Sequence, residues 1–213
     1  TTEIYTLSLH DALPISGLRQ WMATGVAVLA AAALVHTQVP LVVSADAPEG
    51  QSITVVSVNL LKGHADLGAV EALVRDSGAD ILSLQEVTTD WLDRARVSGI
   101  AQRLPYEHSE VVPFAAAAGS ALFSRTPLRG HGVLDDTAFK NLRAVTDLPG
   151  ARGTRVLVIH PAAPTGDAQD WVNDTDAIRK HLHALGDGPV IAIGDYNATW
   201  DQARFRGARK SVV

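Results

Sequence analysis

Four apolar runs in this sequence each end in a side chain of a type that binds metal ions or phosphate. Asn59 closes VVSVN, Glu86 follows ILSLQ, His160 follows VLVI, and Asp195 follows VIAIG, with Asn197 two residues later. If these runs are strands that end at a common edge, their last residues gather in one cleft, where ligands bind in many α/β sheets. The pattern therefore predicts one site for metal or phosphate chemistry.

Each of these residues also has an ordinary structural interpretation. Asp195 and Asn197 share one face of an extended chain, but Gly-Asp-x-Asn is also a good turn sequence. Glu86 would be unremarkable as an exposed carboxylate at a strand end, and His160 as a core or turn histidine. Asn59 alone carries little information. The site hypothesis therefore depends on the occurrence of all five residues together.

Short apolar runs that alternate with amphipathic stretches predict a mixed α/β fold. The runs expected to form strands are Ile53–Val58, Ile81–Leu84, Ala121–Phe123, Val156–Ile159 and Val190–Ile193. Asp66 is expected to cap a helix that stops at Gly78, and Asp167 a longer helix that stops at Gly186. Pro149-Gly150 between two strand-like stretches predicts a β-hairpin. A β-sandwich covered by helices is the architecture that suits these elements.

The residues before position 53 are expected to lie outside this domain. Residues 1–16 match neither an amphipathic pattern nor a targeting signal, and they are interpreted as a translated sequencing adapter. Residues 17–46 contain the uncharged run Trp21–Ala45, which is long enough for a transmembrane helix or signal anchor that leaves the domain extracytoplasmic. A cleaved signal peptide and a buried soluble helix are the alternatives. Residues 47–52 are expected to be a linker.

Composition excludes several classes of protein. The chain has no cysteine, so disulfides, zinc thiolate sites and cysteine nucleophiles are all excluded. Its 213 residues, 46% of them hydrophobic, are enough for a sizeable core. A formal net charge of −5 provides no global positive field for a polyanion, which disfavours nucleic acid as the partner.

Taken in order, the segments VVSVNLL, DILSLQEV, GSALFSRTPL, VLVIHP and GDYNAT resemble motifs of the endonuclease/exonuclease/phosphatase superfamily. The resemblance runs from about Ile53 to Trp200. It implies an α/β fold, a helix-flanked β-sandwich like that of deoxyribonuclease I, over residues 53–213. It also implies hydrolysis of phosphate esters or anhydrides that depends on Mg²⁺, with Mn²⁺ as the alternative ion.

The resemblance also implies a role for each residue of the predicted site. Glu86 would hold Mg²⁺, and Asn59 would assist it and orient a phosphate oxygen. Asp195 would orient or deprotonate the attacking water, while Asn197 would fix Asp195 and the phosphate. His160 would stabilise the transition state or the leaving oxygen.

One departure from the family pattern affects the expected activity. The family finishes with an S-D-H motif on a final strand, and nothing after Asp201 resembles it. The sequence is therefore expected to be a fragment that lacks the C-terminal motif. On this interpretation the fold is incomplete at its C-terminus and catalysis is impaired.

Three hypotheses cover the function. A hydrophobic anchor with an extracytoplasmic domain resembles bacterial membrane proteins of this superfamily that act on polyprenyl pyrophosphate. The leading hypothesis is therefore a phosphoesterase at the bacterial cell membrane that acts on lipid pyrophosphate. A secreted nuclease is second, with Arg125, Arg143, Arg152 and Arg155 as a strip that binds substrate phosphate. Scattered arginines are more often a solvated face. A non-catalytic extracellular binding module, or an inactive fragment, is third.

Overall fold

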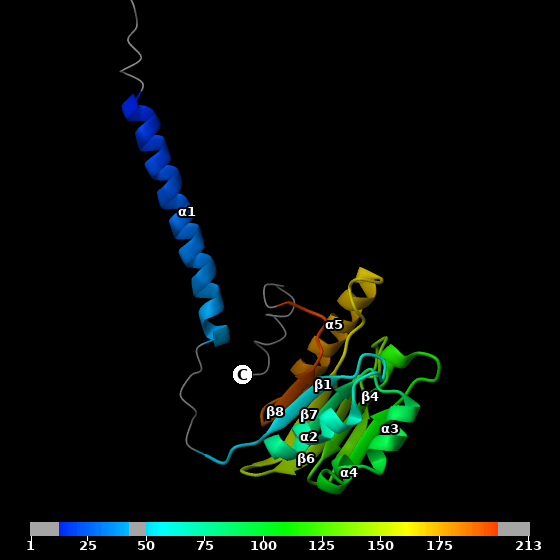
Figure 1. The fold of residues 1–213 in the computed structure, drawn as a ribbon. Helices are drawn as coiled ribbons and strands as arrows, with labels where there is room; N and C mark the ends of the chain where they lie inside the picture. Colours follow the sequence, from blue (N-terminus) through cyan, green and yellow to red (C-terminus); the bar gives the residue numbers. More distant parts are fainter. Residues whose placement is uncertain (1–12, 43–49, 200–213) are drawn as a thin grey trace, which may run out of the picture. The chain divides into compact units, whose positions relative to one another are not determined.

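The computed structural model describes residues 13–42 and 50–199 of the chain (Figure 1). The chain divides into two compact units, Thr1–Glu49 and Gly50–Val213. The described part of the first unit is one helix, α1 (Leu13–Val42). The second unit contains all the described strands.

Helix α1 covers most of the segment predicted to cross a membrane, and its side chains at positions 20–35 are exposed. Within the part of the chain that the structure describes, no helix is both long and apolar enough to traverse a bilayer. The predicted membrane span over residues 21–45 is therefore not supported. Residues 1–12 and 43–49 lie outside the described residues, so the adapter interpretation and the linker boundaries stay predictions.

The second unit is a sandwich of two four-stranded sheets flanked by helices, as the sequence predicts (Figure 1). The first sheet has the order β1-β2-β4-β3, with β1 Val55–Asn59, β2 Ile81–Gln85, β4 Ser120–Ser124 and β3 Tyr106–Glu110. The second has the order β5-β6-β7-β8, with β5 Arg129–Val133, β6 Leu142–Leu148, β7 Ala151–Ile159 and β8 Val190–Gly194. Each sheet contains one parallel pair, β1 with β2 and β7 with β8. The carboxyl ends of these pairs position the site.

Alternating side chains divide each sheet between two apolar layers. In β2, Ile81 belongs to the layer between the sheets, whereas Leu82 packs beneath α2 (Leu67–Ser77), α3 (Thr89–Arg96) and α4 (Gly99–Arg103). In β7, Val158 points to the layer between the sheets, and Leu157 packs against Ile178 of α5 (Ala168–Ala184). Burial on both faces explains why these strands read as continuous apolar runs.

The local signals in the sequence correctly mark the ends of two helices. The Asp66 side chain accepts a hydrogen bond from Ala69 N at 2.7 Å, and Gly78, with φ of 66°, ends α2. Asp167 caps α5, and Gly186 follows its end with φ of 66°. The predicted hairpin is confirmed as well, since β6 and β7 are antiparallel.

Several short elements carry no clear signal in the sequence. The edge strands β3 (YEHSE) and β5 (RGHGV) contain few apolar residues, so they lack the alternation that marks a half-buried strand. The helices α3 and α4 are only 8 and 5 residues long, and η2 (Ala116–Ala118) is a single 3₁₀ turn. Short elements of this kind depend on tertiary packing more than on local propensity.

Gly194, the last residue of β8, lies tightly against the end of β7. Its φ is 153°, and a Cβ at this position would overlap the carbonyl oxygen of Ile159. We expect Gly194→Ala to lower the free energy of unfolding by roughly 1–3 kcal/mol through overpacking. Gly166→Ala is the control, since its Cβ would meet only Ala163 O at an ordinary 3.7 Å. Urea unfolding of both variants checks the prediction, and equal stability would contradict it.

A histidine pair joins the edge strands of the two sheets. The ring centroids of His108 in β3 and His131 in β5 lie 4.6 Å apart. Burial lowers the pKa of His108, and the neighbouring His131 lowers it further. A hydrogen bond with the Gly132 backbone and the charges of Glu110 and Glu107 act in the opposite direction. The folded protein therefore favours the neutral form of His108.

Because His108 takes up its proton more readily in the unfolded chain, protonation favours unfolding. The free energy of unfolding should fall as the pH drops below the ordinary histidine value of about 6.5. His108→Gln should weaken this dependence without abolishing it, since burial also lowers the pKa of His160. Urea titrations at pH 7.5 and pH 5.5 measure the effect, with the exposed His64→Gln as control. An unchanged pH dependence in His108→Gln would exclude this role.

Candidate active site

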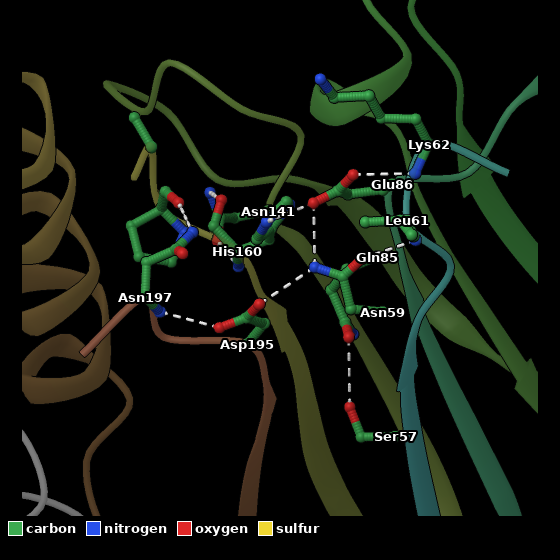
Figure 2. A network of polar contacts seen from close by, with 12 residues as sticks. Ser57, Asn59, Leu61, Lys62, Gln85, Glu86, Asn141, His160, Asp195 and Asn197 are labelled. Atoms are coloured by element: carbon green, nitrogen blue, oxygen red, sulfur yellow. Dashed lines mark hydrogen bonds and ion pairs between the residues drawn. The ribbon is translucent and has the colours of Figure 1, made fainter. Parts of the chain in front are cut away.

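The ends of four strands bring the predicted residues together (Figure 2). Asn59 is the last residue of β1, and Glu86 follows β2. His160 follows β7, and Asp195 follows β8. The two parallel pairs lie on facing sheets, which the Ser83 hydroxyl links by a 3.5 Å hydrogen bond to Ile193 O. The carboxyl ends of both pairs thus open into the same site.

The Asn59 amide connects the two sheets at this point. Its Nδ2 donates to Glu86 Oε1 at 3.0 Å and to Asp195 Oδ2 at 3.0 Å, while its Oδ1 accepts from Leu61 N at 2.9 Å (Figure 2). One nitrogen therefore holds a carboxylate from each sheet. Hydrogen bonds to charged acceptors are the stronger kind, so this contact offsets part of the repulsion between the two carboxylates.

Glu86 is held from a second side by the backbone. Lys62 N donates to Glu86 Oε2 at 2.8 Å, and the Glu86 side chain remains 15% exposed. Glu86, Leu61, Lys62 and Asn197 all have φ between 46° and 56°. A residue other than glycine in this left-handed region costs about 1–3 kcal/mol, and such residues cluster at functional sites. The hydrogen bonds around Glu86 therefore hold a strained backbone in place.

His160 is a buried, neutral imidazole beside these carboxylates. Its Nε2 lies 4.0 Å from Glu86 Oε1, and its ring centroid lies 5.1 Å from that of Phe139. Burial lowers the pKa of His160, while the charges of Asp195, Glu86 and Asp174 and a hydrogen bond with the Ala117 backbone act in the opposite direction. Within the described part of the chain, its buried Nδ1 has no hydrogen-bond partner. A buried polar atom of this kind ordinarily pairs with water or a ligand.

Asn197 links the ends of β8 and β7. Its backbone N–H donates to Asp195 Oδ1 at 2.9 Å, and its side-chain Nδ2 donates to Pro161 O at 2.9 Å. Asp195 therefore accepts from Asn197 on one oxygen and from Asn59 on the other. The next residue in the chain, Tyr196, has its pKa raised to about 12 by burial. These contacts fix the orientation of the Asp195 carboxylate.

Arg125 does not join this cluster, although the sequence predicts that it binds substrate. Its guanidinium donates to the carbonyls of Gly78 and Ala79, both at 2.7 Å, and lies 3.5 Å from Asp80. These partners precede β2, whereas Glu86 follows that strand. The structure thus places Arg125 at the opposite end of the sheet, where it ties β4 to the start of β2.

Two residues that the sequence did not single out also contact the site. Asn141 forms hydrogen bonds with both backbone polar groups of His160, and Asp174 accepts from Ala162 N. Neither residue ends an apolar run, so the pattern that marks the other site residues is absent from them. Asp174 lies on the buried face of α5. A carboxylate on the apolar face of an amphipathic helix is unusual, and this is the one signal in the sequence that could have found it.

The residues present fit Mg²⁺ as an open site. Across residues 13–42 and 50–199, no three or more His, Cys, Asp or Glu side chains are arranged to enclose a metal ion. Mg²⁺ commonly keeps several waters and binds through one or two carboxylates. Glu86 is partly exposed and fixed by two donors, and Asn59 and Asp195 lie beside it. Oxygen ligands of this kind are those that Mg²⁺ prefers.

A helix-flanked sandwich of two sheets, with polar side chains gathered at the strand ends, defines the fold and the site. The model of the endonuclease/exonuclease/phosphatase family matches residues 56–211, and the chain belongs to this family. A search of curated protein sequences found no significant match.

Among solved structures, three similar ones share the fold at low sequence identity. A Staphylococcus aureus beta toxin mutant with bound magnesium ions is 14% identical, with a TM-score of 0.56 over 76% of this chain and 70% of that one. Sphingomyelinase C from Streptomyces griseocarneus is 17% identical, with a TM-score of 0.54 over 76% and 70%. D. rerio TDP2 complexed with a single-strand DNA product is 15% identical, with a TM-score of 0.53 over 74% and 64%.

Replacing Asn59 by aspartate tests the electrostatics of the site. Asn59→Asp removes the donor shared by Glu86 and Asp195 and adds a third negative charge beside them. Without divalent ions, we expect the free energy of unfolding to fall by about 1–3 kcal/mol, the cost of an unsatisfied polar cluster. Added Mg²⁺ should restore part of this loss, because a cation neutralises the cluster.

Urea unfolding in EDTA and in Mg²⁺ measures both effects. Asn173→Asp, on the exposed face of α5, is the matched control. Equal losses in the two variants, with no recovery in Mg²⁺, would contradict this account of the site.

Proposed function

We propose that this chain hydrolyses phosphate ester or anhydride bonds in a reaction that requires Mg²⁺ or Mn²⁺. The observation that carries the proposal is the Asn59 amide, which holds Glu86 and Asp195 together beside the neutral His160. Membership of the endonuclease/exonuclease/phosphatase family supports the reaction class. The bound magnesium ions of the similar beta toxin structure support the choice of ion.

Each side chain of the site has one role in the proposed reaction. Glu86 and Asn59 would hold the cation, which when bound would polarise the phosphoryl oxygen and offset developing negative charge. Asp195 orients the attacking water and accepts its proton. His160, neutral because it is buried, donates a hydrogen bond to an oxygen that gains charge.

Asn197 acts through Asp195 as well as on the phosphate. Its backbone N–H holds one Asp195 oxygen, so the carboxylate stays oriented while the other oxygen faces Asn59. The side-chain Nδ2 is engaged by Pro161 O. That bond uses one of the two hydrogens on Nδ2, so the second N–H is the group that would donate to a phosphate oxygen.

A lipid phosphate is the substrate that we favour over nucleic acid. The net charge is −5, and three arginines of the predicted phosphate-binding strip make hydrogen bonds to backbone carbonyls within the protein. These are Arg125, Arg143 and Arg155. The names of the similar structures span both alternatives, with a sphingomyelinase and a TDP2 bound to a DNA product.

Location outside the cytoplasm belongs to the same hypothesis. The secreted alternative needs no membrane-spanning helix, and it agrees with the absence of such a helix from the described residues. We therefore favour a secreted phosphoesterase over one anchored at the membrane.

Hydrolysis of bis(p-nitrophenyl) phosphate tests the reaction class. We expect activity in Mg²⁺ that EDTA abolishes and added Mg²⁺ restores, at a lowered rate because no S-D-H motif follows Asp201 in this sequence. Glu86→Gln and Asp195→Asn should each lower kcat/KM by about 10²-fold or more, because a metal-side carboxylate and a proton acceptor are lost. Asp76→Asn, an exposed carboxylate on α2, should match the wild type.

Calorimetric Mg²⁺ titration separates the remaining alternatives. Mg²⁺ binding that Glu86→Gln abolishes supports the metal site. Neither Mg²⁺ binding nor hydrolysis would favour the non-catalytic binding module. For an active protein, faster hydrolysis of polyprenyl pyrophosphate vesicles than of single-stranded DNA supports a lipid substrate, and the reverse order supports the nuclease.

A further inference from the structure

The backbone of His160 is held by a side chain where the strand ladder stops. The last register pair between β6 and β7 near this end is Leu142 with Val158. Beyond it, the Asn141 side chain accepts from His160 N at 2.6 Å and donates to His160 O at 3.3 Å (Figure 2). Asn141 is fully buried. Its amide therefore replaces a peptide group of a neighbouring strand at the residue that carries the imidazole.

Asn141 is held in turn by the loop that joins β5 to β6. Its backbone N–H and its Nδ2 both donate to Phe139 O, at 2.9 and 3.2 Å, and its carbonyl accepts from Leu134 N at 2.8 Å. The Phe139 ring lies against the His160 ring, with centroids 5.1 Å apart. One short loop thus contacts both the backbone and the ring of His160.

Asp174 of α5 fastens the chain on either side of this contact. Its Oδ1 accepts from Ala138 N at 2.7 Å, and its Oδ2 accepts from Ala162 N at 2.8 Å. The side chain is only 2% exposed, and a buried carboxylate is costly unless its oxygens are hydrogen-bonded. Both Asp174 oxygens serve the two segments that carry Phe139 and His160.

We infer that Asn141 and Asp174 are positioning residues that fix the His160 imidazole against Glu86 and Asp195. They act through the backbone on both sides of the imidazole, and neither is assigned a chemical step. The catalytic meaning of this inference rests on the proposed function. The geometry itself is independent of turnover, because the hydrogen bonds exist whether or not the protein hydrolyses a substrate.

The test compares Asn141→Ala and Asp174→Asn with the wild-type chain. Asn141→Ala removes both hydrogen bonds to the His160 backbone, whereas Asp174→Asn keeps the shape and loses one acceptor. We expect kcat for bis(p-nitrophenyl) phosphate to fall about 10- to 100-fold in Asn141→Ala, with KM changed less than about twofold. Asp174→Asn should show a smaller loss of the same kind. In both variants the ring resonances of His160 should move in NMR spectra.

Ile178→Val is the control, because it loosens the packing of the buried face of α5 without touching these hydrogen bonds. It should lower stability while leaving kcat and the His160 resonances unchanged. Wild-type kcat and His160 resonances in folded Asn141→Ala would overturn the inference. If Asn141→Ala fails to fold, the same result in Asp174→Asn overturns it. A wild-type chain without hydrolytic activity would defeat the proposed function, and the His160 resonances would still decide the positioning role.

Discussion

Two carboxylates from opposite sheets share a single amide nitrogen, and the geometry of the site depends on this contact. Glu86 and Asp195 would repel one another in a partly buried site, where two like charges are screened less than in water. The Asn59 Nδ2 satisfies one oxygen of each. The strand ends must therefore stay in register across two sheets for the site to exist. The packing that holds the two sheets together is therefore also what assembles the site.

Both sheets meet this requirement with unusual backbone as well as apolar packing. Gly194 lets β8 lie against the end of β7, which brings Asp195 next to His160. Positive φ values at Glu86 and Asn197 turn the chain immediately after the strands, so that side chains point into the site. Strain of this kind persists only where the surroundings determine the conformation. Here the hydrogen bonds from Lys62 N and to Pro161 O provide that support.

What the sequence could predict follows from how local each signal is. The strands that lead to Asn59, Glu86 and Asp195 combine an apolar run with a polar stop, and both are visible in a short window. The edge strand YEHSE has no such run, although the edge strands β1 and β8 do. Asn141 acts on a residue 19 positions away, and Arg125 binds carbonyls 46 and 47 positions away. Contacts of that range belong to the tertiary fold and leave no local pattern.

The two sheets that supply the site residues are encoded far apart in the chain, and this affects how the protein is made. Asn59 and Asp195 are 136 positions apart, and closing so long a loop is entropically slow compared with forming a helix or hairpin. As a chain emerges from the ribosome from its N-terminus, the first sheet can form while its partner is still being synthesised. During that interval Glu86 stands without the facing carboxylate. A nascent chain can therefore reach a stage in which the first sheet is built and the polar site between the sheets does not yet exist.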